Sequence, residues 1–231
     1  MSDAATARGV CLVTGGSRGI GAATARLAAG RGYAVAITYR ERADDAERVV
    51  RDIEAAGGRA LAVQADVGDE AALVRAFEAA DALGPLTLLV NNAGIVGSVG
   101  RLEDVTAAIL ETLVRTNIVG AFLAAREAVR RMSTKRGGRG GSIVNVSSGA
   151  SQLGSPNVWI HYAATKGAMD TMTIGLAKEV AAEGIRVNAV RPGIIDTEIH
   201  ATRPAGQLEK MRQAIPMQRI GTVDEVAATI L

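Results

Sequence analysis

The stretch that decides the fold is VCLVTGGSRGIGAATARLAAG, residues 10–30. A short apolar run meets a cluster of glycines, Gly15, Gly19 and Gly21, and an alanine-rich helical segment follows. Such a turn presents backbone N–H groups and the positive end of a helix dipole at one point, and glycine lets phosphate oxygens approach closely. The stretch predicts a strand, turn and helix that bind a pyrophosphate; a plain strand-to-helix turn is the alternative. The spacing is not that of a P-loop, which disfavours ATP.

The same alternation continues along the 231-residue chain. Apolar runs bounded by Gly, Pro, Asn or Asp alternate with longer stretches of helical period, and the runs are apolar nearly throughout. This pattern is typical of parallel strands that helices cover on both faces. We therefore expect an α/β fold: one doubly wound parallel sheet, residues 1–231, with its ligand site at the carboxyl ends of the strands. Strands are expected at 10–14, 34–39, 60–65, 86–90, 142–147 and 185–190, and helices at 19–31, 42–56, 69–83, 104–133 and 161–183.

Composition narrows the possible partners. The net charge of +2 is too balanced to favour nucleic acid or an acidic membrane surface, and aromatic residues, at 3%, are too few for a single-strand binder. The single cysteine, Cys11, forms no internal disulfide, which fits a reducing compartment. No signal-peptide pattern or segment of about 18 apolar residues is evident, so a cytoplasmic protein is expected. His161 and His200 lack partners at ligand spacing, so no metal site is expected.

Six motifs occur in a specific order: TGGSRGIG (14–21), NNAG (91–94), Asn117, NVSS (145–148), YAATK (162–166) and RPG (191–193). With these motifs the chain resembles the short-chain dehydrogenase/reductase family over essentially its whole length, including its 3-oxoacyl-acyl-carrier-protein reductase and glucose 1-dehydrogenase-like members. The resemblance implies a Rossmann-type fold and hydride transfer between a carbonyl or secondary alcohol and NAD or NADP. It also implies a homotetramer or homodimer, a substrate lid at about 194–221, and a last sheet strand beyond Leu231, where this sequence stops in mid-helix pattern.

The reactive residues centre on a tyrosine and a lysine four positions apart, which therefore share one helix face. A phenol with a pKa near 10 is a poor acid–base at neutral pH, but a neighbouring ammonium and a positive nicotinamide ring would lower that pKa. The resemblance makes Tyr162 the acid/base and Lys166 its tuner and a ligand of the nicotinamide ribose. It makes Ser148 the group that polarises the carbonyl, leaving Ser147 structural, and gives Asn117 a proton-relaying water.

The end of the second strand bears on the choice of cofactor. An NAD binder usually has Asp or Glu there for the ribose 2′-hydroxyl, whereas this chain has Tyr39 and Arg40. Arg40 and Arg18 could grip a 2′-phosphate, so NADP(H) is expected and NAD(H) remains possible; Arg40 could also be a solvated start of the next helix. The cofactor contacts that the resemblance implies are Gly15, Ser17, Arg18, Gly19, Ile20, Gly21, Tyr39, Arg40, Asp66, Val67, Asn92, Ala93, Gly94, Tyr162, Lys166, Pro192, Gly193, Ile195 and Thr197.

Several residues keep two interpretations. Asp66 is either an adenine contact or a turn residue, and Trp159 is either a wall of the substrate pocket or an interface anchor. His161 could line the pocket beside Tyr162, but we expect it to be exposed at the start of its helix. A partly apolar substrate pocket is expected from Ile95, Val96, Leu153, Trp159, Ile199 and His200. The competing function is a non-catalytic dinucleotide sensor, which the retention of both Tyr162 and Lys166 disfavours.

Overall fold

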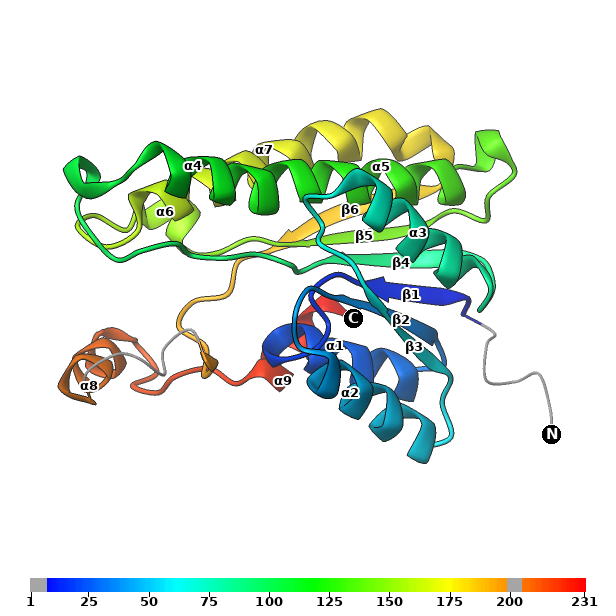
Figure 1. Ribbon diagram of the computed structural model, residues 1–231, viewed down its shortest axis with the longest axis horizontal. Coiled ribbons are helices and arrows are strands. Elements are labelled where there is room, and N and C mark those ends of the chain that lie inside the picture. The colour runs from blue at the N-terminus through cyan, green and yellow to red at the C-terminus, as the bar shows by residue number, and fades with distance from the viewer. Residues whose placement is uncertain (1–7, 199–204) are drawn as a thin grey trace.

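The structure is a computed structural model that describes residues 8–198 and 205–231. The described residues form a six-stranded, all-parallel sheet with the strand order β3-β2-β1-β4-β5-β6, which confirms the expected doubly wound fold (Figure 1). The order reverses between β1 and β4, so the chain crosses to opposite faces on the two sides of β1. The strands are β1 (Val10–Val13), β2 (Ala34–Tyr39), β3 (Ala60–Gln64), β4 (Leu86–Asn91), β5 (Gly141–Val146) and β6 (Ile185–Val190).

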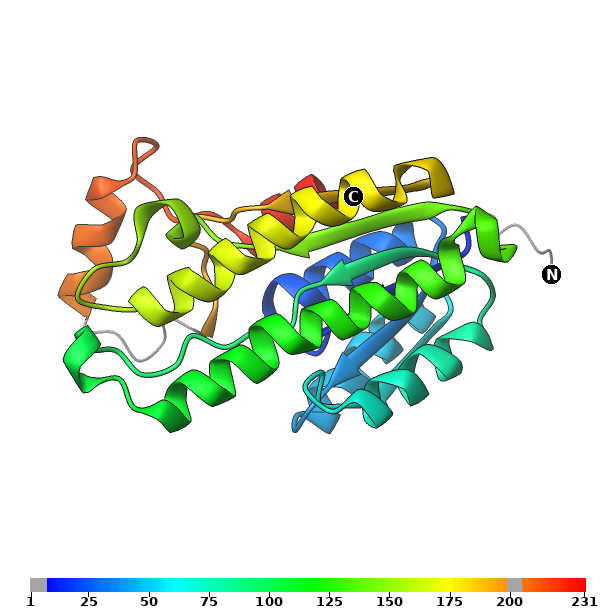
Figure 2. The ribbon, with the colours of Figure 1, turned by 90° about the horizontal axis from the view of Figure 1, so that it is seen from above.

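Helices cover both faces of the sheet (Figures 1 and 2). One layer consists of α1 (Gly19–Gly30), α2 (Ala43–Ala55) and α9 (Val223–Ile230). The other consists of α3 (Glu70–Asp81), α5 (Gly120–Met132) and α7 (Ile160–Val180). Successive residues of β1 point into opposite layers, because side chains alternate across a strand: Val10 and Leu12 pack in the second layer, and Cys11 and Val13 in the first.

Burial falls toward both edges of the sheet, and no residue of the edge strand β3 is fully buried. Every residue of β1 is buried, as the expectation of two covered faces requires. In β6 that expectation is wrong, since Ile185 and Val187 are buried but Arg186 and Asn188 are exposed. The physical reason is that β6 is an edge strand, which packs mainly against α7 on one face and makes fewer contacts with α9 on the other.

The helix expected at 104–133 is divided into three parts. An α-helix, α4 (Ala107–Leu113), leads through a π-helical turn, Val114–Val119, into α5. The run Ala107–Met132 has a mean hydropathy of 1.4 and could cross a membrane by length and composition alone, which the sequence analysis did not foresee. The α5 part of this run packs on the sheet and on the segment after β3: Asn91 Nδ2, from β4, donates to the Ala121 carbonyl at 3.1 Å, and a Cβ on Gly120 would lie 2.7 Å from Val67 Cγ2.

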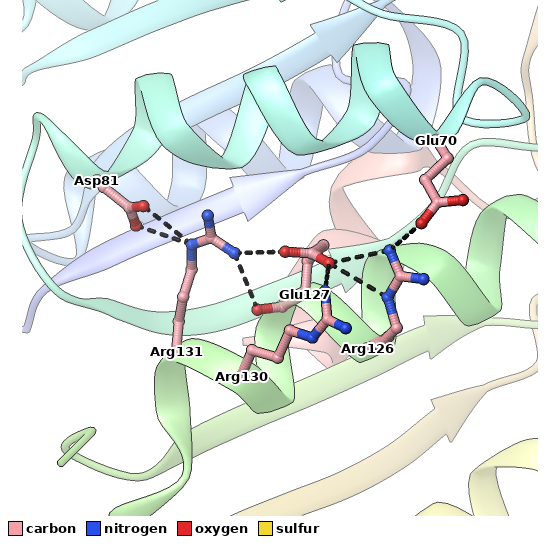
Figure 3. Close-up of polar contacts among 6 residues, drawn as sticks. All are labelled: Glu70, Asp81, Arg126, Glu127, Arg130 and Arg131. Carbon is pink, nitrogen blue, oxygen red and sulfur yellow. Dashed lines mark hydrogen bonds and ion pairs between the residues drawn. The ribbon is translucent and has the colours of Figure 1, made fainter. Parts of the chain in front are cut away.

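A charged network fastens α5 to α3 (Figure 3). The Glu127 carboxylate is only 5% exposed and accepts hydrogen bonds from three arginines, Arg126, Arg130 and Arg131, on its own helix. Burial raises the pKa of Glu127, but these arginines outweigh it, so the pKa lies below its ordinary value. Two of the arginines continue to α3: Arg126 pairs with Glu70 at its first residue, and Arg131 with Asp81 at its last. Such pairing is what makes a buried carboxylate tolerable, and it fixes the helix that follows the π-helical turn.

Other short helices surround the carboxyl end of the sheet. They are α6 (Ala150–Leu153), which follows β5, and α8 (Ala205–Ala214), which follows β6. Figure 1 places α6 and α8 beyond the carboxyl ends of the strands, on the same side as α4. The chain returns from α8 through a parallel bridge between Ile195 and Gly221 and enters α9, whose start is capped by reciprocal hydrogen bonds between Thr222 and Glu225.

Candidate functional site

The glycine-rich turn forms a cradle at positions where a residue with a side chain would be strained or would clash. Gly15 and Gly19 have positive φ angles of 64° and 53°, a region that favours glycine. A Cβ on Gly21 would lie 2.3 Å from the Gly15 carbonyl oxygen and 2.5 Å from Asn92 Nδ2, so α1 begins in contact with the turn. Arg18, the N-cap residue of α1, makes no side-chain capping hydrogen bond. The residues present therefore fit a phosphate-bearing group at the positive end of this helix.

Polar side chains hold the cradle against the segment after β4. Thr14 Oγ1 accepts hydrogen bonds from the backbone N–H groups of Asn92 and Ala93 at 3.0 and 3.1 Å. Asn92 Nδ2 donates to the carbonyls of Thr14 and Gly15 at 3.0 and 2.9 Å. Thr38, from β2, accepts from the Gly15 N–H at 3.2 Å. Thr14 opens the TGGSRGIG motif but was not among the expected contacts, and Thr38 was expected only as part of a strand. The one available signal for these roles is a threonine at the end of a strand.

Asn117 lies within the π-helical turn and is fully buried. Its side-chain amide clamps Ile95, accepting from the Ile95 N–H at 2.9 Å and donating to the Ile95 carbonyl at 2.8 Å. It also donates to Thr165 Oγ1 at 3.0 Å, and Thr165 in turn donates to the Tyr162 carbonyl. Asn117 thus connects the segment after β4 to α7, and the irregular turn is what lets an asparagine sit inside a helix.

Ser148 and Tyr162 face one another across the cavity wall. Ser148 follows β5, where its Oγ accepts from the Ala150 N–H at 3.1 Å. Tyr162 lies in the first turn of α7, and Trp159 packs edge-to-face against it with ring centroids 6.4 Å apart. Burial raises the pKa of Tyr162, and hydrogen bonding with the Ser148 hydroxyl lowers it by less, so the net effect is a rise. The lowered phenol pKa that we expected from Lys166 is not produced by the residues of the chain.

Lys166 is a cation in the interior, with a residue exposure of 3%. Its Nζ donates to the Val146 carbonyl at 2.7 Å and lies 5.8 Å from the centre of the Tyr162 ring. The pKa of Lys166 is lowered from 10.5 to about 8, because the effect of burial exceeds the opposing effect of the Asp170 charge. A Cβ on Gly94 would lie 3.5 Å from this Nζ and 3.3 Å from Asn117 Oδ1, so the chain passes between the two.

A cavity of about 1150 Å³ joins these parts at the carboxyl ends of the strands. It runs from the glycine turn past Ser148, Tyr162 and Lys166 to the segment after β6. All the expected cofactor contacts line it except Gly21, which lies behind the turn, and Asn117 is also set back from the wall. Of the expected substrate-pocket residues, Ile95, Val96, Leu153 and Trp159 line it, whereas Ile199 and His200 lie outside the described residues.

The structure places two sequence neighbours of Tyr162, Trp159 and His161, in different environments. Trp159 lines the cavity, which favours a pocket wall. The expectation for His161 is wrong: it is 5% exposed, and its two ring nitrogens have no hydrogen-bond partner in the described part of the chain. The reason is tertiary, because the first turn of α7 packs on Gly97, where a Cβ would lie 3.1 Å from His161 Nε2. Ser147 is buried and its Oγ donates to the Lys166 carbonyl at 3.3 Å, but the residue also lines the cavity beside Ser148, so its structural role stays a prediction.

The polar mouth of the cavity contains more charges than the motifs indicated. Arg18 and Arg42 both pair with Glu198, and Arg40 pairs with Glu41 at 2.7 Å. All five side chains line the cavity, so Arg42 and Glu198 are additions to the expected set. Asp66 lines it too, and its Oδ1 accepts from the Gly68 N–H at 2.9 Å, so its turn role and its place on the cavity coexist. In residues 8–198 and 205–231, no three His, Cys, Asp or Glu side chains cluster as metal ligands.

Sheet order, glycine cradle and this row of side chains define a dinucleotide-dependent oxidoreductase. The model of the short chain dehydrogenase family matches residues 9–208, and the chain belongs to this family, whose members act on CH–OH groups with NAD or NADP. The "Uncharacterized oxidoreductase YgfF" of Escherichia coli (strain K12) is 52% identical, over 96% of this chain and 91% of the relative. A 3-oxoacyl-(acyl-carrier-protein) reductase of Synechocystis sp. (strain ATCC 27184 / PCC 6803 / Kazusa) is 38% identical, over 96% and 87%. A short chain dehydrogenase from Burkholderia cenocepacia J2315, solved in complex with NADP, is 40% identical with a TM-score of 0.87, over 95% of this chain and 87% of that one.

We expect Lys166→Met to stabilise the protein at pH 7. The pKa of Lys166 is lower in the folded chain than in the unfolded one, so stability is greatest above pH 10.5 and falls as the pH drops toward about 8. At about 1.4 kcal/mol per pH unit, this lowering costs about 3 kcal/mol, part of which the variant regains while the Val146 carbonyl loses its donor. Urea unfolding at pH 7 and pH 9.5 measures the gain, which should shrink at the higher pH. A variant that is less stable than the wild type at pH 7 would contradict the assigned burial cost.

Proposed function

We propose that the protein is an NADP(H)-dependent oxidoreductase that interconverts a carbonyl and a secondary alcohol through Ser148, Tyr162, Lys166 and Asn117. The observation that carries the proposal is the continuity of one cavity, which joins the glycine cradle to the Ser148 and Tyr162 hydroxyls and to the buried Lys166. A site that only bound a dinucleotide could use Lys166 to hold the ribose, but it would have no use for a phenol and a serine hydroxyl paired beside that ammonium.

In the direction of reduction, Tyr162 acts as the acid. Its raised pKa means that the phenol keeps its proton at neutral pH and can donate it to an oxygen that becomes an alkoxide. The Ser148 hydroxyl donates a hydrogen bond to the same oxygen and stabilises the developing charge. The ammonium of Lys166 then stabilises the phenolate left on Tyr162, because an opposite charge nearby favours the ionised form. When bound, the nicotinamide cofactor supplies or accepts the hydride.

Asn117 supports these groups from behind the cavity wall. Its amide fixes the Ile95 backbone and Thr165, and Thr165 holds the first turn of α7, which carries Tyr162. We assign it the ordering of a water that returns protons through Lys166. The glycine turn, Asp66–Val67, Asn92–Gly94 and the segment from Pro192 to Thr197 would hold the phosphates, adenine and nicotinamide, which agrees with their places around the cavity.

The preference for NADP(H) rests on the cavity mouth. Arg18, Arg40 and Arg42 line the place beyond β2, and no carboxylate occupies the last positions of that strand, Thr38 and Tyr39. Guanidinium groups bind phosphate in a bidentate manner, so these arginines suit a 2′-phosphate. Glu41 and Glu198 pair with them in the protein alone and would have to yield to the phosphate.

Arg40→Asp should move the cofactor preference toward NAD(H). The variant removes a cation and adds a charge that repels a 2′-phosphate, so the ratio of kcat/KM for NADPH to that for NADH should fall by about tenfold or more. Arg48→Asp is the matched control, because Arg48 is an exposed arginine on the following helix, α2, that does not line the cavity. An unchanged ratio in Arg40→Asp would exclude the 2′-phosphate role of this residue.

Tyr162→Phe should retain cofactor binding and lose turnover. The phenyl ring keeps the packing against Trp159 but has no proton to exchange, so kcat should fall by about two to four orders of magnitude. NADPH fluorescence titration measures binding, and a panel of ketones and secondary alcohols measures turnover. Near wild-type turnover in the variant would refute the acid/base assignment. Cofactor binding by the wild type without turnover of any substrate in the panel would favour the sensor alternative.

The substrate is proposed to lie between the apolar residues Ile95, Val96, Leu153 and Trp159 and a lid at about 194–221. The lid is closed at its base by the bridge between Ile195 and Gly221, where Asp196 N and Gly221 N donate to backbone carbonyls at 2.9 and 3.0 Å. From α8, Met211 reaches the cavity wall. These residues suit a ketone or secondary alcohol with an apolar flank.

We further propose a cytoplasmic homo-oligomer, a homotetramer or homodimer. Burial raises the pKa of Cys11, so its thiol is unreactive. A free, buried cysteine is compatible with the reducing environment of the cytoplasm. The outer side of the α4–α5 run exposes large apolar side chains, which in a soluble oligomer are buried against a second copy. They are Leu110, Val114, Val119 and Phe122, with Ile174 on α7.

Phe122→Glu should lower the mass of the assembly. Phe122 is 51% exposed on the outer side of α5, so its replacement leaves the core intact but places a charge in the proposed interface. Light scattering after size-exclusion chromatography gives the mass, and circular dichroism controls for folding. Leu153→Glu, another exposed apolar residue but away from this face, is the matched control. A wild type that is monomeric at micromolar concentration would refute the proposed assembly.

A further inference from the structure

Asp170 is a partly buried carboxylate on α7, four residues after Lys166 and one helical turn from it. Its side chain is 13% exposed, and Oδ2 accepts from Arg191 Nε at 2.9 Å. The other oxygen, Oδ1, is buried and has no directed hydrogen-bond partner among the described residues. A carboxylate in this position, unlike one on the surface, acts on whatever lies around it because little water screens its charge.

The polar groups around Asp170 come from the loop after β5 and the turn after β6, which both line the cavity near Ser148. Arg191 directly follows β6 and precedes Pro192 and Gly193, which line the cavity. The hydroxyls of Ser151 and Ser147 lie beside the carboxylate, on either side of Ser148 in the chain. Burial raises the pKa of Asp170, but these two hydroxyls and Arg191 outweigh it and hold the pKa below its ordinary value.

The two loops that meet at Asp170 are also joined through their backbones. Ser147 N donates to the Val190 carbonyl at 2.8 Å, and Gly149 N donates to the Pro192 carbonyl at 2.9 Å. The Ser151 hydroxyl donates to the Ser148 carbonyl at 2.9 Å, so it touches the loop of Ser148 and Asp170 together. A hydroxyl can rotate its hydrogen between nearby acceptors, so both serines can favour the ionised form of the Asp170 carboxylate.

Lys166 is the second charged group that faces Asp170. The charge of Asp170 opposes the effect of burial on Lys166 and favours its ammonium form. The other titratable group close to Lys166 is Tyr162, whose ring lies 5.8 Å from Nζ, and Arg191 lies on the far side of the carboxylate. The acid that maintains the ammonium is therefore the same one that ties down the two loops.

We propose that Asp170 is a positioning residue of the active site, one carboxylate that fixes the Ser148 loop, the Pro192–Gly193 turn and the Lys166 ammonium relative to one another. It touches neither the reacting atoms nor the cavity wall, and it acts through Ser148 and Lys166. This inference rests on the proposed function for what these two residues do, but the coupling of Asp170 to Lys166 is a property of the protein alone.

The first test measures that coupling without cofactor or substrate. The free energy of unfolding by urea is measured at pH 7 and pH 9.5 for three backgrounds: the wild type, Asp170→Asn and Arg191→Gln. Each background is measured with and without the additional substitution Lys166→Met, and the difference is the stabilisation by Lys166→Met in that background. In Asp170→Asn the buried lysine loses its counter-charge, so the stabilisation by Lys166→Met at pH 7 should be larger than in the wild type. In Arg191→Gln the carboxylate remains, so that stabilisation should be unchanged or smaller.

Both variants break the same ion pair, so they separate charge coupling from a merely structural role. Equal effects of Asp170→Asn and Arg191→Gln on the Lys166→Met difference would overturn the proposal. Asp170→Glu keeps the charge and should restore the wild-type difference at least in part. Asp52→Asn, which breaks the exposed Arg26–Asp52 pair between α1 and α2, should leave the difference unchanged.

The second test measures NADPH affinity by fluorescence at pH 6.5 and pH 9. Loss of the counter-charge lets Lys166 deprotonate at lower pH, so Asp170→Asn should weaken binding at pH 9 by about tenfold more than at pH 6.5. Arg191→Gln should weaken it equally at both values. Coupling in the unfolding experiment with no pH-dependent loss of affinity would support the positioning of Lys166 but refute its ribose-binding role. Absence of coupling in the unfolding experiment would overturn the proposal whatever the affinities are.

Discussion

The structure depends on the parallel pairing of β1 with β2 on one side and β4 on the other. Because parallel strands need crossovers, and the crossovers on the two sides of β1 lie on opposite faces, the chain parts at the carboxyl ends of β1 and β4. The loops that follow the strands surround this gap, and their side chains do not fill it. The cavity of about 1150 Å³ is the consequence, and its walls come from the segments after every strand of the sheet.

At that gap, close backbone contact replaces side-chain packing. Gly21 brings the first turn of α1 against Gly15 and Asn92, and the hydroxyl of Thr14 satisfies two backbone N–H groups of the neighbouring segment. The amide of Asn117 does the same for Ile95 from the opposite side. Buried polar groups are costly unless hydrogen-bonded, so these side chains make the irregular backbone at this edge compatible with a packed fold.

The end of the cavity that contains Lys166 lowers the stability of the folded protein. An ammonium in the interior costs free energy, and the pKa of Lys166, lowered to about 8, expresses that cost. The rest of the molecule offsets it with a core that fills both faces of the sheet and with the Glu127 network between α5 and α3. Asp170 offsets it locally by placing a carboxylate on the same helix. The cost of burying this charge is thus located where the proposed function needs a group that is held firmly and ionised.

The sequence by itself determined the element order, the parallel sheet and the motifs that meet at its carboxyl edge. These follow from short-range information: apolar runs, helical period and glycines at a turn, so the expected strands agree with the observed ones to within a residue or two. The expected cofactor and reactive residues lie around one cavity, apart from Gly21 and Asn117 just behind its wall, because parallel strands bring their following loops together.

Only the tertiary structure decided the remaining features. The π-helical turn at Asn117, the burial of His161, the bracing by Thr14, Thr38 and Thr165, and the placement of Arg42, Glu198 and Asp170 depend on contacts between residues distant in the chain. Local periodicity has no information about such contacts. A histidine at the start of a helix is as compatible with solvent as with the interior until the neighbouring loop is placed. The pKa of each group in the site likewise follows from burial and from the charges that folding brings beside it.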